Sequence, residues 1–250
     1  MPGHDEQYWG TEFNDIHEAD VTVAIAQFLF EYLQKDPRFN VTITRTQMGY
    51  TDTFKNYFEN SRQQIQDFIT ASRQNFKGQV ATGNMQMNEG VPHATAKPEV
   101  ALRLYGINKW ANENNIDYIV HIHIDDEGGR RYGKKGKYKG FTVYIPDREY
   151  SNGSTSMPFG KAIRDSLIKK YPSSTFPPES GGFVQDQQLI ALGASNTLKP
   201  SAALIEYGYI YEHQFLNPDT QDFYTKAYAK QTYLGIASFF KNNPNTLLAH

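Results

Sequence analysis

The sequence contains no cysteine at all. This absence excludes disulfide bonds, thiolate metal sites and a cysteine nucleophile, and it leaves histidine and carboxylate side chains as the available metal ligands. A continuous stretch of about 18 apolar residues is also missing, which excludes a membrane-spanning helix. The net charge is only −2, so the chain as a whole is not attracted to nucleic acid. We therefore expect a protein with no membrane span and no nucleic-acid partner.

The N-terminus lacks the charged, apolar and small-residue segments of a secretion leader. Apolar and aromatic residues, in contrast, are plentiful, at 39% and 14% of the 250 residues. A chain of this length and composition can bury one substantial hydrophobic core. We therefore expect a single domain over residues 1–250, acting as a monomer.

Segments with helical and strand-like patterns alternate along the chain. Apolar residues at helical spacing predict helices at 13–35, 54–76, 99–114, 156–170 and 219–241. Short apolar or alternating runs predict strands at 41–45, 118–125, 141–146, 187–192 and 203–208. The alternation predicts an α/β fold, a layered domain whose central mixed, largely parallel twisted sheet is flanked by helices on both faces. In such sheets, functional residues gather at the strand ends.

The run YIVHIHID at 118–125 carries two histidines that share a side. Strand alternation places Ile119, His121, His123 and Asp125 on one face of this strand. A lone histidine, such as His4 near the N-terminus, is more often a hydrogen-bonded core or surface residue than a metal ligand. Two imidazoles on one face favour a metal site more strongly.

Two glutamates stand in apolar surroundings. Glu206 interrupts the run ALIEYG, and a carboxylate is rarely buried without a partner. Either Glu206 belongs to a functional site, or it forms a salt bridge with an arginine such as Arg45. Glu18 falls on the inward apolar stripe of its predicted helix, although an acid is also favoured by the positive end of a helix. A divalent cation is one efficient partner for imidazoles and carboxylates that are removed from water.

Seven short segments stand in the order found in a known family. They are PGH at 2–4, Glu18, VTITR at 41–45, WAN at 110–112, YIVHIHID at 118–125, GFTVYI at 140–145 and AALIEYGYI at 202–210. The ordered set resembles the zinc-dependent N-acetylmuramoyl-L-alanine amidases, and the resemblance covers most of the chain. It implies hydrolysis of the amide bond between N-acetylmuramic acid and L-alanine, with peptidoglycan as the partner. It also implies an extracytoplasmic location, in the periplasm or at the cell wall.

Carried over position by position, the resemblance implies that His4, Glu18 and His123 bind Zn²⁺. It makes Glu206 the catalytic acid/base. His121 stands where the family has a serine, so it either competes for the metal or orients a ligand.

The sequence departs from the family pattern at two further places. Only Met1 and Pro2 precede the Gly-His pair, so we expect the domain to lack its first strand, as in a truncated product. The stretch at about 47–98 resembles an insertion of a helix and a polar loop, which is a lid, a partner surface or a tolerated elaboration.

A glycine-spaced basic segment, GGRRYGKKGKYKG at 128–140, follows the His123 strand. Such a segment is usually a solvated loop, and its functional alternative is to hold an anionic wall polymer near the zinc. Two other function classes remain open for the whole chain. One is a zinc peptidase or deacylase acting on another amide, and the other is a noncatalytic wall-binding or regulatory domain of the same fold.

Overall fold

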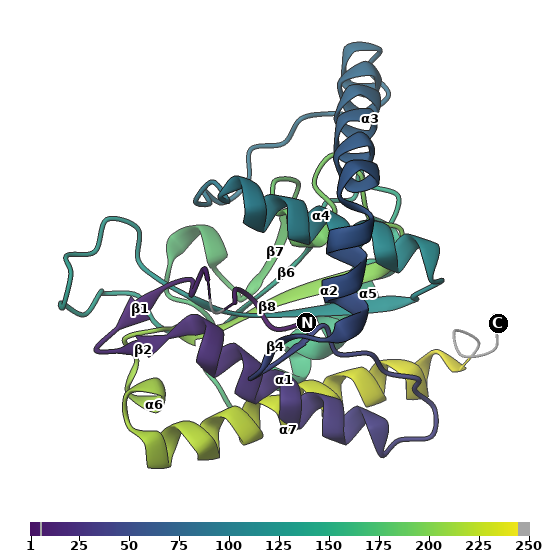
Figure 1. Ribbon diagram of the computed structural model, residues 1–250. Helices are drawn as coiled ribbons and strands as arrows, with labels where there is room; N and C mark the ends of the chain where they lie inside the picture. The colour runs from purple at the N-terminus through teal and green to yellow at the C-terminus, as the bar shows by residue number, and fades with distance from the viewer. Residues whose placement is uncertain (6, 245–250) are drawn as a thin grey trace.

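The computed structural model describes residues 1–5 and 7–244, and within them a four-stranded sheet forms the centre (Figure 1). The strands, in the spatial order β5-β8-β6-β7, are β5 (Tyr118–Asp125), β8 (Ser201–Tyr209), β6 (Thr142–Pro146) and β7 (Phe183–Asp186). β5 is parallel to β8, β6 is antiparallel to β8, and β7 is parallel to β6. The expected mixed sheet is therefore confirmed.

Helices cover both faces of this sheet, as the sequence pattern predicted. One face packs against α1 (Glu18–Gln34), α5 (Gly153–Leu167) and α7 (Pro218–Asn242), and α1 and α7 lie together below the sheet in Figure 1. The other face is covered by α4 (Pro98–Glu113) and the short 3₁₀ helix η2 (Ile190–Leu192). Because β5 and β8 are buried on both faces, they read as nearly continuous apolar runs in the sequence.

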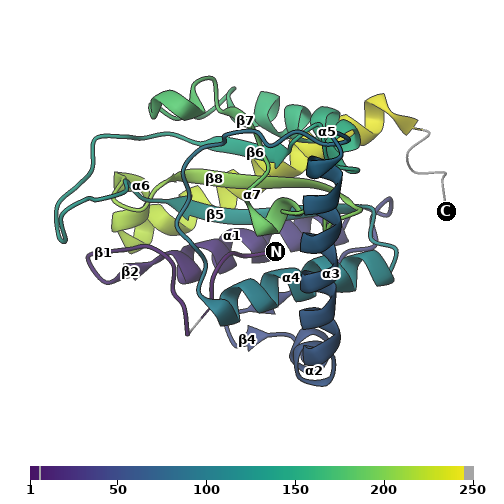
Figure 2. The ribbon, with the colours of Figure 1, turned by 90° about the horizontal axis from the view of Figure 1, so that it is seen from above.

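Two helices and a long connection lie on the α4 side of the sheet. α2 (Asp52–Asn60) is followed by α3 (Arg62–Ala81), which stands away from the body in Figure 1 and packs on α4 through a small separate core. Residues 82–97 then return over the sheet, with Val91 buried in the core of that face (Figure 2). The predicted helix at 54–76 is thus two helices that meet at Ser61. Whether this part of the chain is an insertion stays a prediction.

The first residues of the chain run along the outer edge of β5. Gly3 N–H donates to the carbonyl of Ile122 at 2.7 Å, Ile122 N–H donates to the carbonyl of Met1 at 2.9 Å, and Pro2 forms a parallel bridge with Ile122. This pairing delivers His4 to the strand that carries His123. The expectation that a preceding strand is missing stays a prediction.

The predicted helix at 13–35 begins too early. Asn14 and Asp15 take φ values of 50° and 61° and form a two-residue turn between β1 (Glu12–Phe13) and β2 (Ile16–His17). Such turns need positive φ at both positions, which asparagine and aspartate tolerate. The helix therefore starts only after this hairpin, with Glu18 as its first residue.

Two predicted strands are also wrong. In segment 41–45 only Arg45 is in a strand, as part of β3 (Arg45–Thr46), which pairs with β4 (Gly49–Tyr50), while residues 41–44 line a cavity of about 420 Å³ beside β5. Segment 187–192 follows β7 instead of forming an edge strand. The carboxylate of Asp186 accepts the N–H groups of Gln188 and Leu189 at 2.7 and 2.8 Å, which turns the chain into η2.

The remaining short elements are η1 (Pro177–Glu179) and α6 (His213–Leu216). No helix among residues 1–5 and 7–244 has the length and apolar character needed to cross a membrane.

Candidate active site

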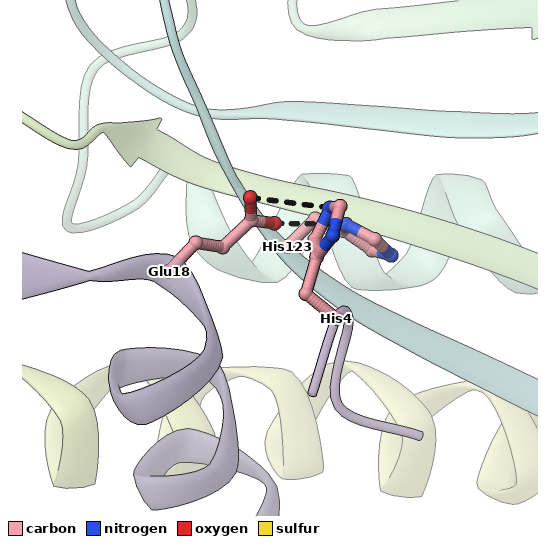
Figure 3. A group of neighbouring side chains, drawn as sticks. All are labelled: His4, Glu18 and His123. Atoms are coloured by element: carbon pink, nitrogen blue, oxygen red, sulfur yellow. Dashed lines mark hydrogen bonds and ion pairs between the residues drawn. The ribbon is translucent and has the colours of Figure 1, made fainter. Parts of the chain in front are cut away.

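Three of the predicted site residues meet in one cluster. His4 comes from the first loop, Glu18 from the start of α1 and His123 from β5, and Figure 3 shows both imidazoles turned toward the carboxylate. One Glu18 oxygen lies 3.3 Å from His4 Nε2, and the other lies 2.9 Å from His123 Nδ1. Within the described chain, these are the residues that offer three ligand atoms within 4.8 Å of one another.

The β1–β2 hairpin and the end of β5 hold the Glu18 carboxylate in place. Thr11 N–H donates to Oε2 at 3.1 Å, and Ile124 N–H donates to Oε1 at 3.1 Å. Burial opposes ionisation of this side chain, but the imidazoles of His4 and His123 outweigh burial and lower the pKa of Glu18 below its ordinary value of 4.5. Glu18 is therefore an ionised carboxylate at neutral pH, as a metal ligand must be.

The glycine before His4 is required by the packing of the site. A Cβ atom on residue 3 would lie 2.3 Å from Cε1 of the His123 ring, so only glycine fits there. The Gly3 carbonyl accepts hydrogen bonds from Thr22 Oγ1 at 3.0 Å and from Arg45 Nη2 at 3.1 Å, which fix the loop. Burial lowers the pKa of His4, although the Glu18 carboxylate opposes this effect. His4 therefore carries a neutral imidazole with a lone pair at neutral pH.

Glu206 lies on β8 directly beside the cluster. It is the register partner of His123 on the adjacent parallel strand, and it shares its face with Ala202 and Leu204, which belong to the α4-side core. Its Oε2 atom is buried and has no hydrogen-bond partner. Burial, and after it the carboxylates of Asp125 and Glu18, raise the pKa of Glu206 well above its ordinary value.

His121, the second histidine of β5, lies outside the three-residue cluster. Its side chain is fully buried. Burial lowers the pKa of His121 well below its ordinary value, so the ring is neutral.

A buried acid that the sequence did not reveal lies on the same side of the sheet. Glu179 accepts hydrogen bonds from Thr142 at 3.0 Å, from Tyr209 at 3.1 Å and from the Tyr144 hydroxyl. Burial, and after it the Glu179 carboxylate, raise the pKa of Asp125 well above its ordinary value. Glu179 follows two prolines between the predicted helix at 156–170 and the predicted strand at 187–192, and no local signal there distinguishes a buried acid from an exposed one.

The three clustered residues fit a divalent cation. Two imidazoles and one carboxylate form a donor set that is typical of catalytic zinc, and ligand distances of roughly 2.0–2.2 Å place tetrahedral ligand atoms about 3.4 Å apart. The distances of 3.3 Å from His4 Nε2 to Glu18 Oε2 and 2.9 Å from His123 Nδ1 to Glu18 Oε1 are close to that spacing. A cation among these atoms would compensate the cost of removing the polar groups from water.

Solved amidase structures share this architecture. The chain is similar to the CwlD amidase from Clostridioides difficile, solved in complex with the GerS lipoprotein, with a TM-score of 0.60 and 15% identity over 96% of this chain and 95% of that one. It is also similar to an N-acetylmuramoyl-L-alanine amidase from Clostridium difficile 630, with a TM-score of 0.58 and 17% identity over 96% and 94% of the two chains. For amidase AmiC2 of Nostoc punctiforme, the TM-score is 0.56 and the identity 13%, again over 96% and 94%.

At these levels of identity, the comparisons place the protein in the class of α/β proteins with the amidase fold. No curated protein matches the sequence. The family follows from the sequence itself, because residues 1–238 match the family model Amidase_3, described as N-acetylmuramoyl-L-alanine amidase, and the chain belongs to that family. It is therefore an enzyme of the peptidoglycan amidase class, and the resemblance seen in the sequence is confirmed.

Proposed function

We propose that this amidase depends on zinc, with His4, Glu18 and His123 as its ligands and Glu206 as its catalytic acid/base. The convergence of two imidazoles and one carboxylate supports this proposal most strongly, together with the Glu206 oxygen on the neighbouring strand that is buried without a hydrogen-bond partner. The substrate is the amide bond between N-acetylmuramic acid and L-alanine in peptidoglycan. Because peptidoglycan lies outside the cytoplasmic membrane, we infer that the enzyme acts there.

The chemistry divides between the cation and the protein. Bound zinc supplies Lewis-acid polarisation of the scissile carbonyl and lowers the pKa of a water molecule. Glu206 accepts the proton of the attacking water at its carboxylate and returns a proton to the departing amine nitrogen. A positioned acid/base of this kind contributes about 10² to 10⁴ in rate.

The surroundings of Glu206 suit both halves of this proton transfer. Its pKa is raised first by burial and then by the neighbouring carboxylates, so the group takes up a proton more readily than an exposed glutamate does. Oε2 makes no hydrogen bond that would hold it away from the substrate. An acid/base works best when its pKa lies near the working pH, and a raised carboxyl pKa moves in that direction.

Measuring bound metal together with reaction products tests the proposal. The purified protein should hold close to one zinc ion and release amines from purified sacculi without producing new reducing ends. Turnover of ordinary peptides in preference to muropeptides would assign a peptidase activity instead. Wall binding without amine release in the zinc-loaded protein would contradict the proposal and favour a noncatalytic domain.

A further inference from the structure

Residues 126–140, in the connection between β5 and β6, are strongly basic and are called the basic loop below. It projects from the body in both ribbon views (Figures 1 and 2). Six lysine or arginine residues and two acids give it a net charge of +4, within a chain of net charge −2. The exposed cations are Arg131, Lys134, Lys135, Lys137 and Lys139. Positive charge is thus concentrated at one place on an otherwise slightly acidic molecule.

The sixth cation, Arg130, ties the base of the basic loop to the protein. Its guanidinium donates to the Asp126 carboxylate at 2.6 and 2.8 Å, to the Glu12 carbonyl at 2.9 Å and to the Lys134 carbonyl at 2.8 Å. It also lies 5.2 Å from the centroid of the Phe13 ring, and its side chain is only 8% exposed. The exposed cations therefore extend from an ordered base.

Hydrogen bonds from a single residue, Thr11, link this base to the proposed metal site. Thr11 donates its N–H to Oε2 of Glu18 at 3.1 Å and its hydroxyl to Oδ2 of Asp126 at 2.8 Å. Asp126 in turn accepts from Arg130. A ligand carboxylate and the anchor of the basic loop thus share Thr11 as a common partner, which places the loop next to the site of hydrolysis.

We propose that the basic loop binds a phosphodiester polyanion carried by the cell wall and so holds the wall next to the active site. The inference rests on the proposed function, because the wall is the substrate of that reaction. Lysine side chains are flexible point charges, which suit repeated phosphates better than a single planar group. Glycines between the cations let the loop follow a chain of charges.

Other polyanions fit the basic loop less well. Tyr132 is the one exposed aromatic residue in it, so it offers neither a row of stacking surfaces for nucleic acid nor an apolar face for insertion into a membrane. The wall is also the body that must approach the adjacent cluster during the proposed reaction. Charge complementarity and position together favour the wall polymer.

Cosedimentation with two preparations of sacculi tests this proposal. One retains its phosphodiester polymer, and the other has lost it through treatment with hydrofluoric acid. At about 50 mM salt, the zinc-loaded enzyme should bind the untreated sacculi at least about tenfold more tightly, and the preference should fade as salt is raised. The variant Arg131→Gln/Lys134→Gln/Lys135→Gln should lose this preference. The matched variant Lys55→Gln/Lys169→Gln/Lys170→Gln removes the same charge from exposed sites elsewhere and should keep it.

Hydrolysis of a soluble muropeptide separates this inference from the proposed function. Both triple variants should release amine from the muropeptide at the wild-type rate, since their substitutions spare the metal site and Arg130. If the wild type releases no amine, the proposed function fails, while the binding comparison still tests the basic loop. Equal binding to the two sacculi, unchanged binding by the Arg131 variant, or preferential retention on duplex DNA or anionic lipid vesicles would overturn the proposal.

Discussion

His123 and Glu206 are directly paired on the neighbouring parallel strands β5 and β8. Both side chains lie on the face of the sheet that also carries His121. Backbone register alone therefore brings a predicted ligand and a predicted proton carrier together. A slip of one residue in either strand would turn one of the two side chains to the opposite face of the sheet. The apolar residues that alternate with them, Ile122 and Ile205, are fully buried on the other face and hold this register.

Glu206→Gln should separate metal binding from turnover. Glutamine has nearly the same shape but accepts no proton at neutral pH, so kcat for amine release should fall by about 10² to 10⁴. Bound zinc should stay at the wild-type level because Glu206 lies outside the ligand cluster. Glu59→Gln, at an exposed position on α2, is the control and should leave both quantities unchanged. Wild-type kcat in Glu206→Gln would remove this residue from the mechanism.

His123→Ala should remove zinc and amidase activity together. The substitution leaves His4 and Glu18 as the two remaining donors, too few for the three-ligand site of a catalytic zinc. Metal analysis after dialysis against a weak chelator measures the loss, and adding zinc should restore activity to the wild type but not to the variant. His213→Ala, which changes an exposed histidine outside the cluster, should retain both zinc and activity. Full zinc occupancy in His123→Ala would show that the metal lies elsewhere.

Two glycines inside helices should respond in opposite ways to alanine. At Gly235, where α7 crosses α5, a Cβ would lie 2.7 Å from the Cα of Ile163, so Gly235→Ala should lower the free energy of unfolding by about 1–3 kcal/mol. At Gly78 in α3, nothing lies within 4 Å of an added Cβ. Gly78→Ala should therefore raise the free energy of unfolding by about 0.5–1 kcal/mol through helix propensity. Urea denaturation measures both, and equal changes of the same sign would contradict the packing argument.

Much of the sheet and the site could be predicted because the relevant signals are local. The alternation in β5 places His121 and His123 on one face, and the apolar run of β8 identifies a buried strand around Glu206. α7 was predicted to within one residue at each end, because its helical pattern follows a proline and ends in a polar segment. Only the family resemblance placed the Gly-His pair at the N-terminus in the same site as these strands, because spacing in the sequence does not reveal distance in space.

What escaped prediction depends on contacts between distant segments. The turn at Asn14 and Asp15 carries a recognisable hairpin signal, but the apolar spacing of α1 concealed it. Segment 41–45 has a strand-like composition, but a segment forms a strand only when it pairs with a neighbouring strand. The free edge of β5 pairs with the first residues of the chain instead of with this segment. The burial of Glu179 is decided by hydroxyls from β6 and β8, on which its own segment carries no information.

Asp36→Asn should destabilise the protein in a pH-dependent way. Asp36, two residues after α1, accepts from Arg38 Nε at 2.9 Å and from the Tyr233 hydroxyl of α7 at 3.1 Å. Hydrogen bonding to Arg38, although burial opposes it, lowers the pKa of Asp36 from 3.8 to about 2.

A carboxyl whose pKa is lower in the folded state stabilises that state fully above its unfolded pKa, and the contribution is lost as pH falls through the folded value. After allowance for the partly exposed Arg38, the free energy of unfolding at pH 7 should drop by about 1–2 kcal/mol in the variant. That difference should shrink between about pH 4 and pH 2 in urea titrations. Asp222→Asn, at an exposed site on α7, should show little change at any pH, and an Asp36→Asn deficit that stays constant down to pH 2 would exclude the ion pair as its cause.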